Sequence, residues 1–342
     1  MYIKCCIFVL VLFKNYLNII ASECGCGETS RSKSIEDAPT FDSTQNGISN
    51  GYCTAPITTD FVHDEMVQIS GGDYLVGTNE PIFESDQESP ERSIHVNGYF
   101  IDKYEVSNAE FSQFIQATNY LTYSEKFGDS FVFQAQLTPT QQNLYKDSRV
   151  ASVPWWYKVN GTSWKHPEGV DSSIGDRLDH PVVHVSWFDA SAFCKWKGKR
   201  LPTEFEWEVA CRGGKNQKLY PWGNKLQPGD KHWLNIWQGA FPNDNTGEDG
   251  FTSTCPINRF KQNDYDLYNM VGNVWEWTDT KWNESGDEED LETVERVKKG
   301  GSYLCHKSYC YRYRCAARSS NTADSSAGNL GFRCAKSINQ LD

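Results

Sequence analysis

The chain has 342 residues and a mean hydropathy of −0.62, which is enough for one large domain or two ordinary ones. Its net charge is −12 and no block of Lys or Arg stands out, which argues against nucleic acid and anionic membrane surfaces as partners. Aromatic residues make up 14% of the sequence, with 12 Trp against 3 Met, so we expect a rigid aromatic core.

The N-terminus predicts a secretory signal over residues 1–22. Lys4 gives a positively charged start, residues 5–13 are apolar, and a small-residue cleavage site follows. The alternative is an internal hydrophobic strand. The apolar run is too short to cross a bilayer, so no membrane insertion is expected. Sequons for N-glycosylation at Asn160 and Asn283 agree with a secretory compartment.

Residues 23–60 predict a mobile extension, because Ser, Thr, Asp, Asn and Gly dominate and aliphatic residues are few. The extension contains Cys24-Gly25-Cys26. Exposed cysteines on such an arm suit mixed disulfides with luminal thiol oxidoreductases, a disulfide-linked dimer, or a local bridge in a monomer. The folded domain is expected over residues 61–338.

The first part of this domain predicts strands. Apolar residues on either side of Gly71-Gly72 indicate a hairpin-like strand pair, and residues 99–102 indicate another strand.

Three helices follow, each predicted by a capping residue and apolar residues at helical spacing behind it. The caps are Ser107, Ser186 and Thr203. Long stretches between and after these helices show no helical or strand period. The sequence therefore predicts one α+β domain with little regular secondary structure, which would need additional covalent or metal links.

Cys305 and Cys310 lie five positions apart in a segment rich in Tyr, Arg and Ser. In a secreted chain such a pair is a disulfide, a metal site or a redox catalyst, and a disulfide is the ordinary expectation. Zinc would need two further ligands, and only His306 is near in sequence. Two thiolates suit a soft ion such as Cu(I). A pair that oxidises substrates by thiol exchange is the main mechanistic alternative.

Several motifs between residues 66 and 334 point to the same protein family. They are Gly300–Cys315, Asn329–Cys334, His184-Val185-Ser186-Trp187, Gly198–Glu204, Pro221-Trp222-Gly223-Asn224 and Gly272–Trp277. In these motifs the chain closely resembles the formylglycine-generating enzymes, also called sulfatase-modifying factors. The resemblance implies a compact single-domain α+β fold, distantly related to C-type lectin modules and stabilised by disulfides and calcium.

The resemblance also implies an activity, the oxidation of a cysteine in the Cys-x-Pro-x-Arg segment of newly made sulfatases to Cα-formylglycine with O2 and copper. It assigns Cys305 and Cys310 to Cu(I), with the substrate cysteine as a third ligand. Hydrogen would then leave the substrate Cβ, and the resulting thioaldehyde would hydrolyse. Ser302 and Tyr309 would orient oxygen or water. His306 would donate a hydrogen bond from behind the two copper ligands. The expected location is the lumen of the endoplasmic reticulum, with partial secretion as an option.

The same resemblance assigns further residues. It pairs Cys194 with Cys334 and Cys211 with Cys315. Cys53 and Cys255 fall outside the family pattern; they could pair with each other, or either could remain free. Two structural calcium ions are implied. The first would be held by Asn235, Ile236, Asp249 and Phe251, and the second by Asn269, Gly272, Val274 and Glu276. A groove for the substrate peptide would use Trp155, Trp156, Trp275 and Asn329.

Three other functions stay open at this point. A catalytically silent regulator that binds sulfatases would have no need of Cys305 and Cys310. An iron-dependent sulfoxide synthase would need a three-histidine site, and the 7 His form no His-x-x-x-His-x-Glu cluster. A carbohydrate-binding lectin leaves the thiol pair unexplained.

Overall fold

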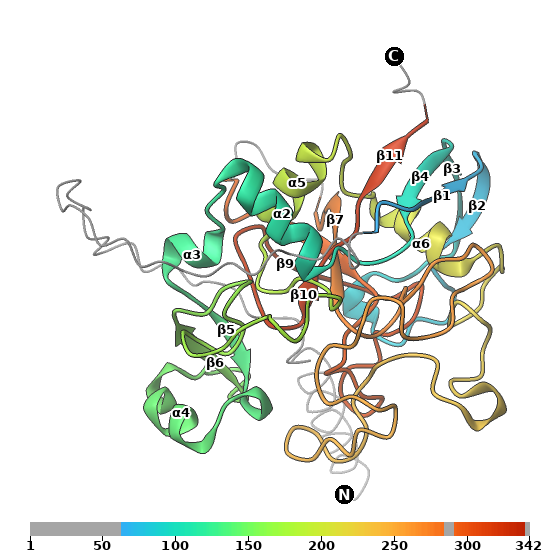
Figure 1. Ribbon diagram of the computed structural model, residues 1–342. Coiled ribbons are helices and arrows are strands. Elements are labelled where there is room, and N and C mark those ends of the chain that lie inside the picture. Colours follow the sequence, from blue (N-terminus) through green and yellow to red (C-terminus); the bar gives the residue numbers. More distant parts are fainter. Residues whose placement is uncertain (1–62, 284–290, 339–342) are drawn as a thin grey trace, which may run out of the picture.

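The computed structural model of the chain describes residues 63–283 and 291–338. The predicted signal, the extension, Cys24-Gly25-Cys26 and Cys53 lie outside the described residues. Within the described part, a three-stranded and a four-stranded sheet are accompanied by two separate strand pairs (Figure 1). Helices and long loops surround these strands (Figure 1), as the predicted α+β class requires.

The three-stranded sheet is antiparallel and joins the two ends of the domain. Its order is β1 (Met66–Ile69), β4 (Tyr99–Asp102) and β11 (Ala335–Ser337). A separate antiparallel pair is formed by β2 (Gly72–Val76) and β3 (Arg92–Val96). The predicted strands on both sides of Gly71-Gly72 therefore exist, but the prediction that they pair with each other is wrong.

The reason lies at the corner between these strands. A Cβ atom on Gly71 would lie 2.9 Å from the backbone nitrogen of Gly98, so the two backbones pass each other at contact distance. Glycine allows this close approach. The chain thereby leaves one sheet and enters the other, and β1 and β2 each find a later strand as partner.

The four-stranded sheet lies in the second half of the chain. Its order is β10 (Leu330–Gly331), β7 (Trp275–Lys281), β8 (Glu295–Lys299) and β9 (Arg318–Thr322). The short β10 runs parallel to β7, and the other neighbours are antiparallel. The second strand pair, β5 (Asp129–Phe133) with β6 (Trp156–Asn160), lies in a lobe at one side together with the short helix α4 (Pro139–Leu144) (Figure 1).

The three predicted helices are confirmed, and each begins with a capping box on the predicted residue. They are α2 (Asn108–Thr118), α5 (Trp187–Trp196) and α6 (Glu204–Arg212). Sequence reasoning missed two short helices, although both also begin with capping boxes. These are α3 (Tyr123–Phe127) and α4 (Pro139–Leu144). Single 3-10 turns occur at Glu84–Asp86 (η2), Gln134–Gln136 (η3), Lys146–Ser148 (η4) and Pro228–Asp230 (η5).

Two disulfides hold the long irregular part of the domain. Between α6 and β7, from Gly213 to Val274, the short η5 is the only regular element of a fully described stretch. Cys194 of α5 is bonded to Cys334, and Cys211 of α6 is bonded to Cys315. These are the two pairs that the family resemblance implies. Each closes a loop of more than 100 residues, worth about 4–5 kcal/mol in the chain-entropy model.

The core is aromatic, as the composition predicts. Five tryptophans are at most 1% exposed: Trp156, Trp207, Trp237, Trp275 and Trp277. In the part of the chain that the structure describes, no helix combines the length and the apolar character needed to cross a membrane.

Candidate active site

The thiols of Cys305 and Cys310 face each other in the interior. Their Sγ atoms are 2.8 Å apart, no disulfide joins them, and both residues are fully buried. Backbone turns produce this arrangement. The Cys305 amide donates to the carbonyl of Ser302 at 2.9 Å, and the Cys310 amide donates to the carbonyl of His306 at 2.8 Å. The structure therefore brings together the two cysteines that the sequence singled out.

Gly301 shapes the start of this loop. Its φ of 71° lies in the left-handed region, and a Cβ atom on it would be 2.9 Å from the backbone nitrogen of Tyr313. Only glycine meets both conditions without strain. The two ends of the thiol loop, residues 301–315, thus run backbone to backbone beside the sulfurs.

Ser302 and Asn329 meet next to Cys305. The side-chain amide of Asn329 donates to Ser302 Oγ at 3.0 Å, and the Ser302 amide approaches Cys305 Sγ at 3.4 Å. The carbonyl of Asn329 accepts from the amide of Trp275 at 2.9 Å, which fixes Asn329 to the start of β7. Two predicted site residues from distant parts of the chain therefore converge on the thiols.

Tyr309 and His306 occupy the outer side of the loop. The ring of Tyr309 stacks on Phe241, with ring centroids 3.6 Å apart. His306 Nδ1 lies 2.8 Å from Ser308 Oγ, and burial lowers the pKa of its imidazole. The carbonyl of His306 holds Cys310 through the amide of that residue, and the role of the His306 ring as a donor stays a prediction.

The segment after Cys310 is anchored by two buried ion pairs. Arg312 contacts Asp86 through Nε and Nη2, at 2.5 and 2.9 Å. Arg314 contacts Glu88 through both terminal nitrogens, at 2.7 and 2.5 Å, and these two side chains are at most 1% exposed. Sequence reasoning missed Asp86 and Glu88, because both precede the thiol loop by more than 200 residues.

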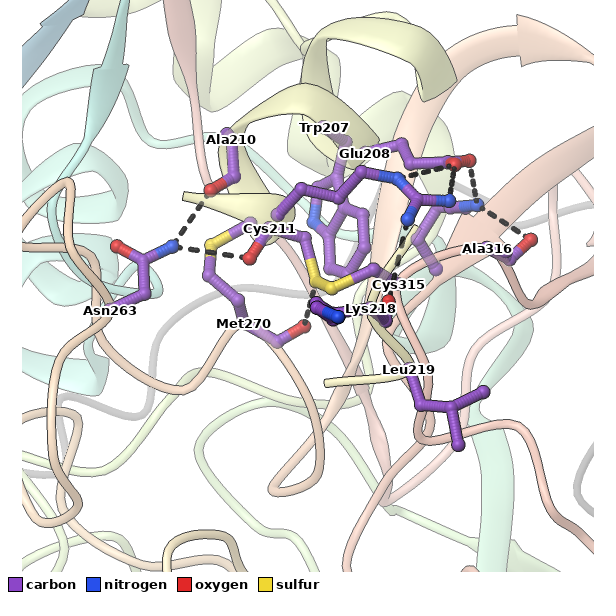
Figure 2. Close-up of a disulfide and its surroundings, with 12 residues drawn as sticks. Trp207, Glu208, Ala210, Cys211, Lys218, Leu219, Asn263, Met270, Cys315 and Ala316 are labelled. Carbon is purple, nitrogen blue, oxygen red and sulfur yellow. Dashed lines mark hydrogen bonds and ion pairs between the residues drawn. A yellow bond between two sulfur atoms is a disulfide. The ribbon is translucent and has the colours of Figure 1, made fainter. Parts of the chain in front are cut away.

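The Cys211–Cys315 disulfide is the next anchor (Figure 2). It ties the end of the thiol loop to α6, with Cα atoms 5.6 Å apart. Beside it, the carboxylate of Glu208 accepts from Arg212 at 2.7 Å and from the buried amine of Lys299 at 3.2 Å. Burial lowers the pKa of Lys299, and the pKa of Glu208 stays below its usual value because burial is outweighed by Lys299 and Arg212.

The first predicted calcium set contains suitable oxygen atoms. Asn235 Oδ1 is buried and has no hydrogen-bond partner. Asp249 Oδ2 accepts from the Ile236 amide at 2.9 Å, and its Oδ1 accepts from the Phe251 amide at 2.9 Å. Burial raises the pKa of Asp249. Sequence reasoning missed Gln238 at this set. Its amide nitrogen contacts both Asp249 Oδ2 and the carbonyl oxygen of Ile236, so these two oxygens face the same atom and could bind the same ion.

The second set fits in part. Asn269 Oδ1 is buried without a hydrogen-bond partner. Glu276, however, is fully engaged: its carboxylate binds Arg333 bidentately at 2.7 Å and accepts from Trp207 Nε1 at 2.7 Å. Its predicted role as a calcium ligand stays a prediction, and its side chain is the ion-pair partner of Arg333. Gly272 and Val274 would contribute only backbone carbonyls to this set. A Cβ atom placed on Gly272 would lie within 3.2 Å of backbone atoms of Asn235, so the backbones of the two predicted sets are in contact.

Glu105 is a nearby carboxylate that sequence reasoning did not find. It is 1% exposed and accepts from the amides of Asn269 and Asn273, each at 2.9 Å. Burial raises its pKa to about 8. The Asn235 amide in turn donates to Asn273 Oδ1 at 3.2 Å, so the two predicted calcium sets are joined through Asn273.

Two predicted groove residues belong to the core instead. Trp156 is 1% exposed and Trp275 is fully buried, so neither presents a ring face to a peptide. Their strands, β6 and β7, point these rings inward. Trp155 is half-buried and packs edge-on against Phe241 at 5.2 Å, which links it to Tyr309. A separate cavity of about 460 Å³ lies beside Arg200 and Glu206, on other elements than the thiol pair.

The remaining predicted positions are readily placed. Asn160 and Asn283 are exposed, as a glycosylation acceptor must be. Cys255 is fully buried, its amide donates to Asn273 Oδ1 at 2.9 Å, and burial raises the pKa of its thiol. Its predicted pairing with Cys53 concerns a residue outside the described ones.

Comparisons with known proteins place this geometry in context. The formylglycine-generating enzyme of Mus musculus is 51% identical over 328 residues, which cover 92% of this chain and 86% of the mouse protein. A Bos taurus relative named inactive C-alpha-formylglycine-generating enzyme 2 is 44% identical over 273 residues, or 79% of this chain and 87% of that protein.

The fold is also found in solved structures. PvdO from Pseudomonas aeruginosa superposes with a TM-score of 0.56 at 19% identity, covering 80% of this chain and 94% of PvdO, which shows a shared fold. The family model of the sulfatase-modifying factor enzyme 1-like domain matches residues 55–338. The chain therefore belongs to the sulfatase-modifying factor enzyme family.

Proposed function

We propose that this protein oxidises a cysteine in the Cys-x-Pro-x-Arg segment of newly made sulfatases to Cα-formylglycine, with O2 and Cu(I), and thereby activates them. The observation that carries the proposal is the buried thiol pair, with Sγ atoms 2.8 Å apart, beside the hydrogen bond from Asn329 to Ser302. Relatives that are named formylglycine-generating enzymes, at 51% identity, support it.

The donor set at the thiols suits Cu(I). Two sulfurs are soft ligands, and Cu(I) accepts few of them. Zinc would require about four ligands, and within residues 63–283 and 291–338 no three His, Cys, Asp or Glu side chains gather into a metal-binding group. Cys305 and Cys310 would therefore hold copper, which when bound supplies the redox chemistry with O2.

The protein's own residues prepare the reaction. The Ser302 amide approaches Cys305 Sγ at 3.4 Å and so holds that sulfur in place. Asn329 fixes the Ser302 hydroxyl beside the sulfurs, where it can orient oxygen or water. Full burial of both cysteines keeps bulk water from the site, which protects a reactive sulfur compound until its hydrolysis. Tyr309, stacked on Phe241, closes the outer side.

Calcium would stabilise the loops next to this site. The buried oxygens of Asn235 and Asn269 lack hydrogen-bond partners, and a bound cation would satisfy them. Asp249 and the carbonyl of Ile236 would complete the first site. In the second, Gly272, Val274 and Glu276 would join Asn269, and the carboxylate of Glu105 lies beside them.

Location and partners follow from the sequence. The N-terminal signal and the exposed sequons support a place in the secretory pathway, where nascent sulfatases pass through the endoplasmic reticulum. Cys24 and Cys26 would bind luminal thiol oxidoreductases or join two copies of the chain.

A catalytically silent regulator of sulfatases is the second candidate function. It is favoured by a relative named as an inactive enzyme at 44% identity. A regulator, however, would not need two adjacent thiols in a water-free interior, and that observation favours the enzyme.

The test uses purified full-length protein and a Cys-x-Pro-x-Arg peptide in air, with and without Cu(I). Mass spectrometry follows conversion of the thiol to the aldehyde. Cys305→Ser and Cys310→Ser are compared with Cys255→Ser, a matched substitution at another buried thiol.

Copper-dependent conversion that is lost in the first two variants and kept in the third is the expected result. Conversion that needs no copper would point to oxidation by thiol exchange. No conversion by folded, copper-loaded protein would favour the regulator, and conversion by all three variants would overturn the assigned site.

A further inference from the structure

The proposed function leaves an electron deficit at the buried site. Reduction of O2 to water takes four electrons, and oxidation of the substrate thiol to the thioaldehyde level releases only two. In the balanced reaction, one substrate thiol, one O2 and two molecules of a thiol reductant R′SH give one aldehyde, one hydrogen sulfide, one water and one disulfide R′SSR′. Cys305, Cys310 and Ser302 are all fully buried, so a reductant that stays at the surface can deliver its two electrons only across a layer of protein.

Tyr313 stands at the inner end of a path through that layer. Its backbone packs against Gly301, one residue before Ser302, and Tyr311, two residues before it, directly follows Cys310. The ring is 1% exposed. Tyrosine is one of the few side chains that can lose and regain an electron at biological potentials, together with tryptophan.

The path continues outward through oxidisable rings in contact. The ring of Tyr313 lies 5.2 Å from that of Tyr311 and 6.3 Å from that of Tyr220, to which it is nearly parallel. The hydroxyls of Tyr220 and Tyr311 are hydrogen-bonded at 2.6 Å. Tyr220 then stacks on Trp222 at 5.5 Å. These separations are those of packed aromatic pairs.

The outer end of the path reaches solvent. Trp222 is half-buried and packs edge-on against Trp233 at 5.5 Å, which is half-buried as well. Tyr311 is also half-buried, so its phenolic proton can be exchanged with water. Every ring from the thiol pair to this surface is therefore Tyr or Trp.

A second oxidisable ring lies on the outer side of the loop. Tyr309 directly precedes Cys310, is half-buried, and stacks on Phe241, which packs against Trp155 and Trp237 at 5.2 Å from each. Tyr309 is therefore the competing exit for an electron, and a disulfide yield that survives the loss of the Tyr313 hydroxyl would identify that exit.

We propose that Tyr313, Tyr311, Tyr220 and Trp222 form an electron relay between the buried thiol pair and a thiol reductant at the protein surface. The relay passes one electron at a time inward. A tyrosine that gives up its electron releases its proton to water at Tyr311, and it regains both when R′SH is oxidised. After two such transfers two R′SH have become R′SSR′, and all relay residues are back in their reduced forms.

The test requires neither copper nor peptide. Metal-free, reduced full-length protein is irradiated without oxygen in the presence of a tris(bipyridine)ruthenium complex and a cobalt(III) quencher, which together generate a one-electron oxidant in solution. The oxidant is too large to reach the buried thiols. Withdrawal of two electrons through the relay converts the pair to a Cys305–Cys310 disulfide with release of two protons, which alkylation and mass spectrometry detect. Transient absorption detects the tyrosyl radical.

We expect the disulfide and the radical in the wild type and their loss in Tyr313→Phe. The double variant Tyr220→Phe/Tyr311→Phe is expected to lose the disulfide too, and because it removes both partners of one hydrogen bond it leaves no hydroxyl unpaired. Tyr157→Phe is the matched control, since Tyr157 is fully buried elsewhere in the core and its hydroxyl has no hydrogen-bond partner.

Undiminished disulfide yield in both relay variants would overturn the relay, and if one variant failed to fold the other would decide. The outcome is independent of the proposed function. Disulfide formation through the relay in a protein that does not convert the peptide would contradict only the oxidase, whereas conversion without a working relay would mean that the reductant contacts the site directly.

Discussion

The ion pair between Glu88 and Arg314 gives a prediction that can be worked out from the structure. Both side chains are at most 1% exposed, and two hydrogen bonds join them. Replacing Glu88 by Gln leaves the guanidinium in the interior without its counter-charge. Breaking a buried pair on one side costs about 3–5 kcal/mol. We therefore expect Glu88→Gln to lower the free energy of unfolding by about 3 kcal/mol or more.

The assay is urea unfolding followed by tryptophan fluorescence, with Glu168→Gln as the matched control. Glu168 also binds an arginine, Arg177, through two hydrogen bonds, but these side chains are 19% and 22% exposed. Solvent screens such a pair, and its loss should cost about 1 kcal/mol or less.

A third variant separates charge from shape. The double substitution Glu88→Leu/Arg314→Met replaces both charges by apolar groups of similar size, and such replacements are neutral or even stabilising by about 1–4 kcal/mol. It should unfold at a higher urea concentration than Glu88→Gln. If Glu88→Gln were no less stable than Glu168→Gln, the reasoning from burial would be refuted.

Further predictions concern pH, calcium and the hydroxyl at the site. Burial lowers the pKa of His184 to about 3, so the folded state resists its protonation. Stability should fall as the pH drops from about 6.5 toward 3, by on the order of 5 kcal/mol, and His184→Asn should flatten this slope in acid unfolding curves. Removal of calcium with a chelator should lower the melting temperature of the wild type but change that of Asn235→Ala little, because that variant lacks a ligand; an equal shift in both would contradict the site. Asn329→Ala should slow peptide conversion without weakening Cu(I) binding in a competition titration, since Asn329 holds Ser302 and not the sulfurs. A parallel loss of copper affinity would speak against that division of roles.

Local sequence signals were the most reliable guide to this fold. Each of the three predicted helices begins at its predicted cap, because a capping box is a contact among four consecutive residues and needs nothing from the rest of the chain. Strand pairing depends on distant partners. That is why the hairpin expected around Gly71-Gly72 was wrong, although both of its strands are present.

The residues of the candidate site can be divided in the same way, into those joined by local contacts and those joined by long-range contacts. Cys305, Cys310 and Ser302 lie close in sequence and are close in space. Asp86 and Glu88 act on the thiol loop from more than 200 residues away and carry no motif that would show it. The motif around Glu276 likewise does not reveal that Arg333 binds its carboxylate.

The Cys211–Cys315 bond has a consequence for biosynthesis. Cys305, Cys310 and Cys315 lie within eleven residues, and Cys315 follows Cys211 by 104 residues, so during synthesis the partner of Cys211 appears late and together with two other thiols. A bond to Cys310 instead of Cys315 would give a molecule of identical mass and identical thiol count. Such an isomer would have lost the thiol pair altogether. Quality control of this protein therefore has to distinguish disulfide connectivity, and any preparation judged by mass or thiol titration alone could be inactive without appearing so.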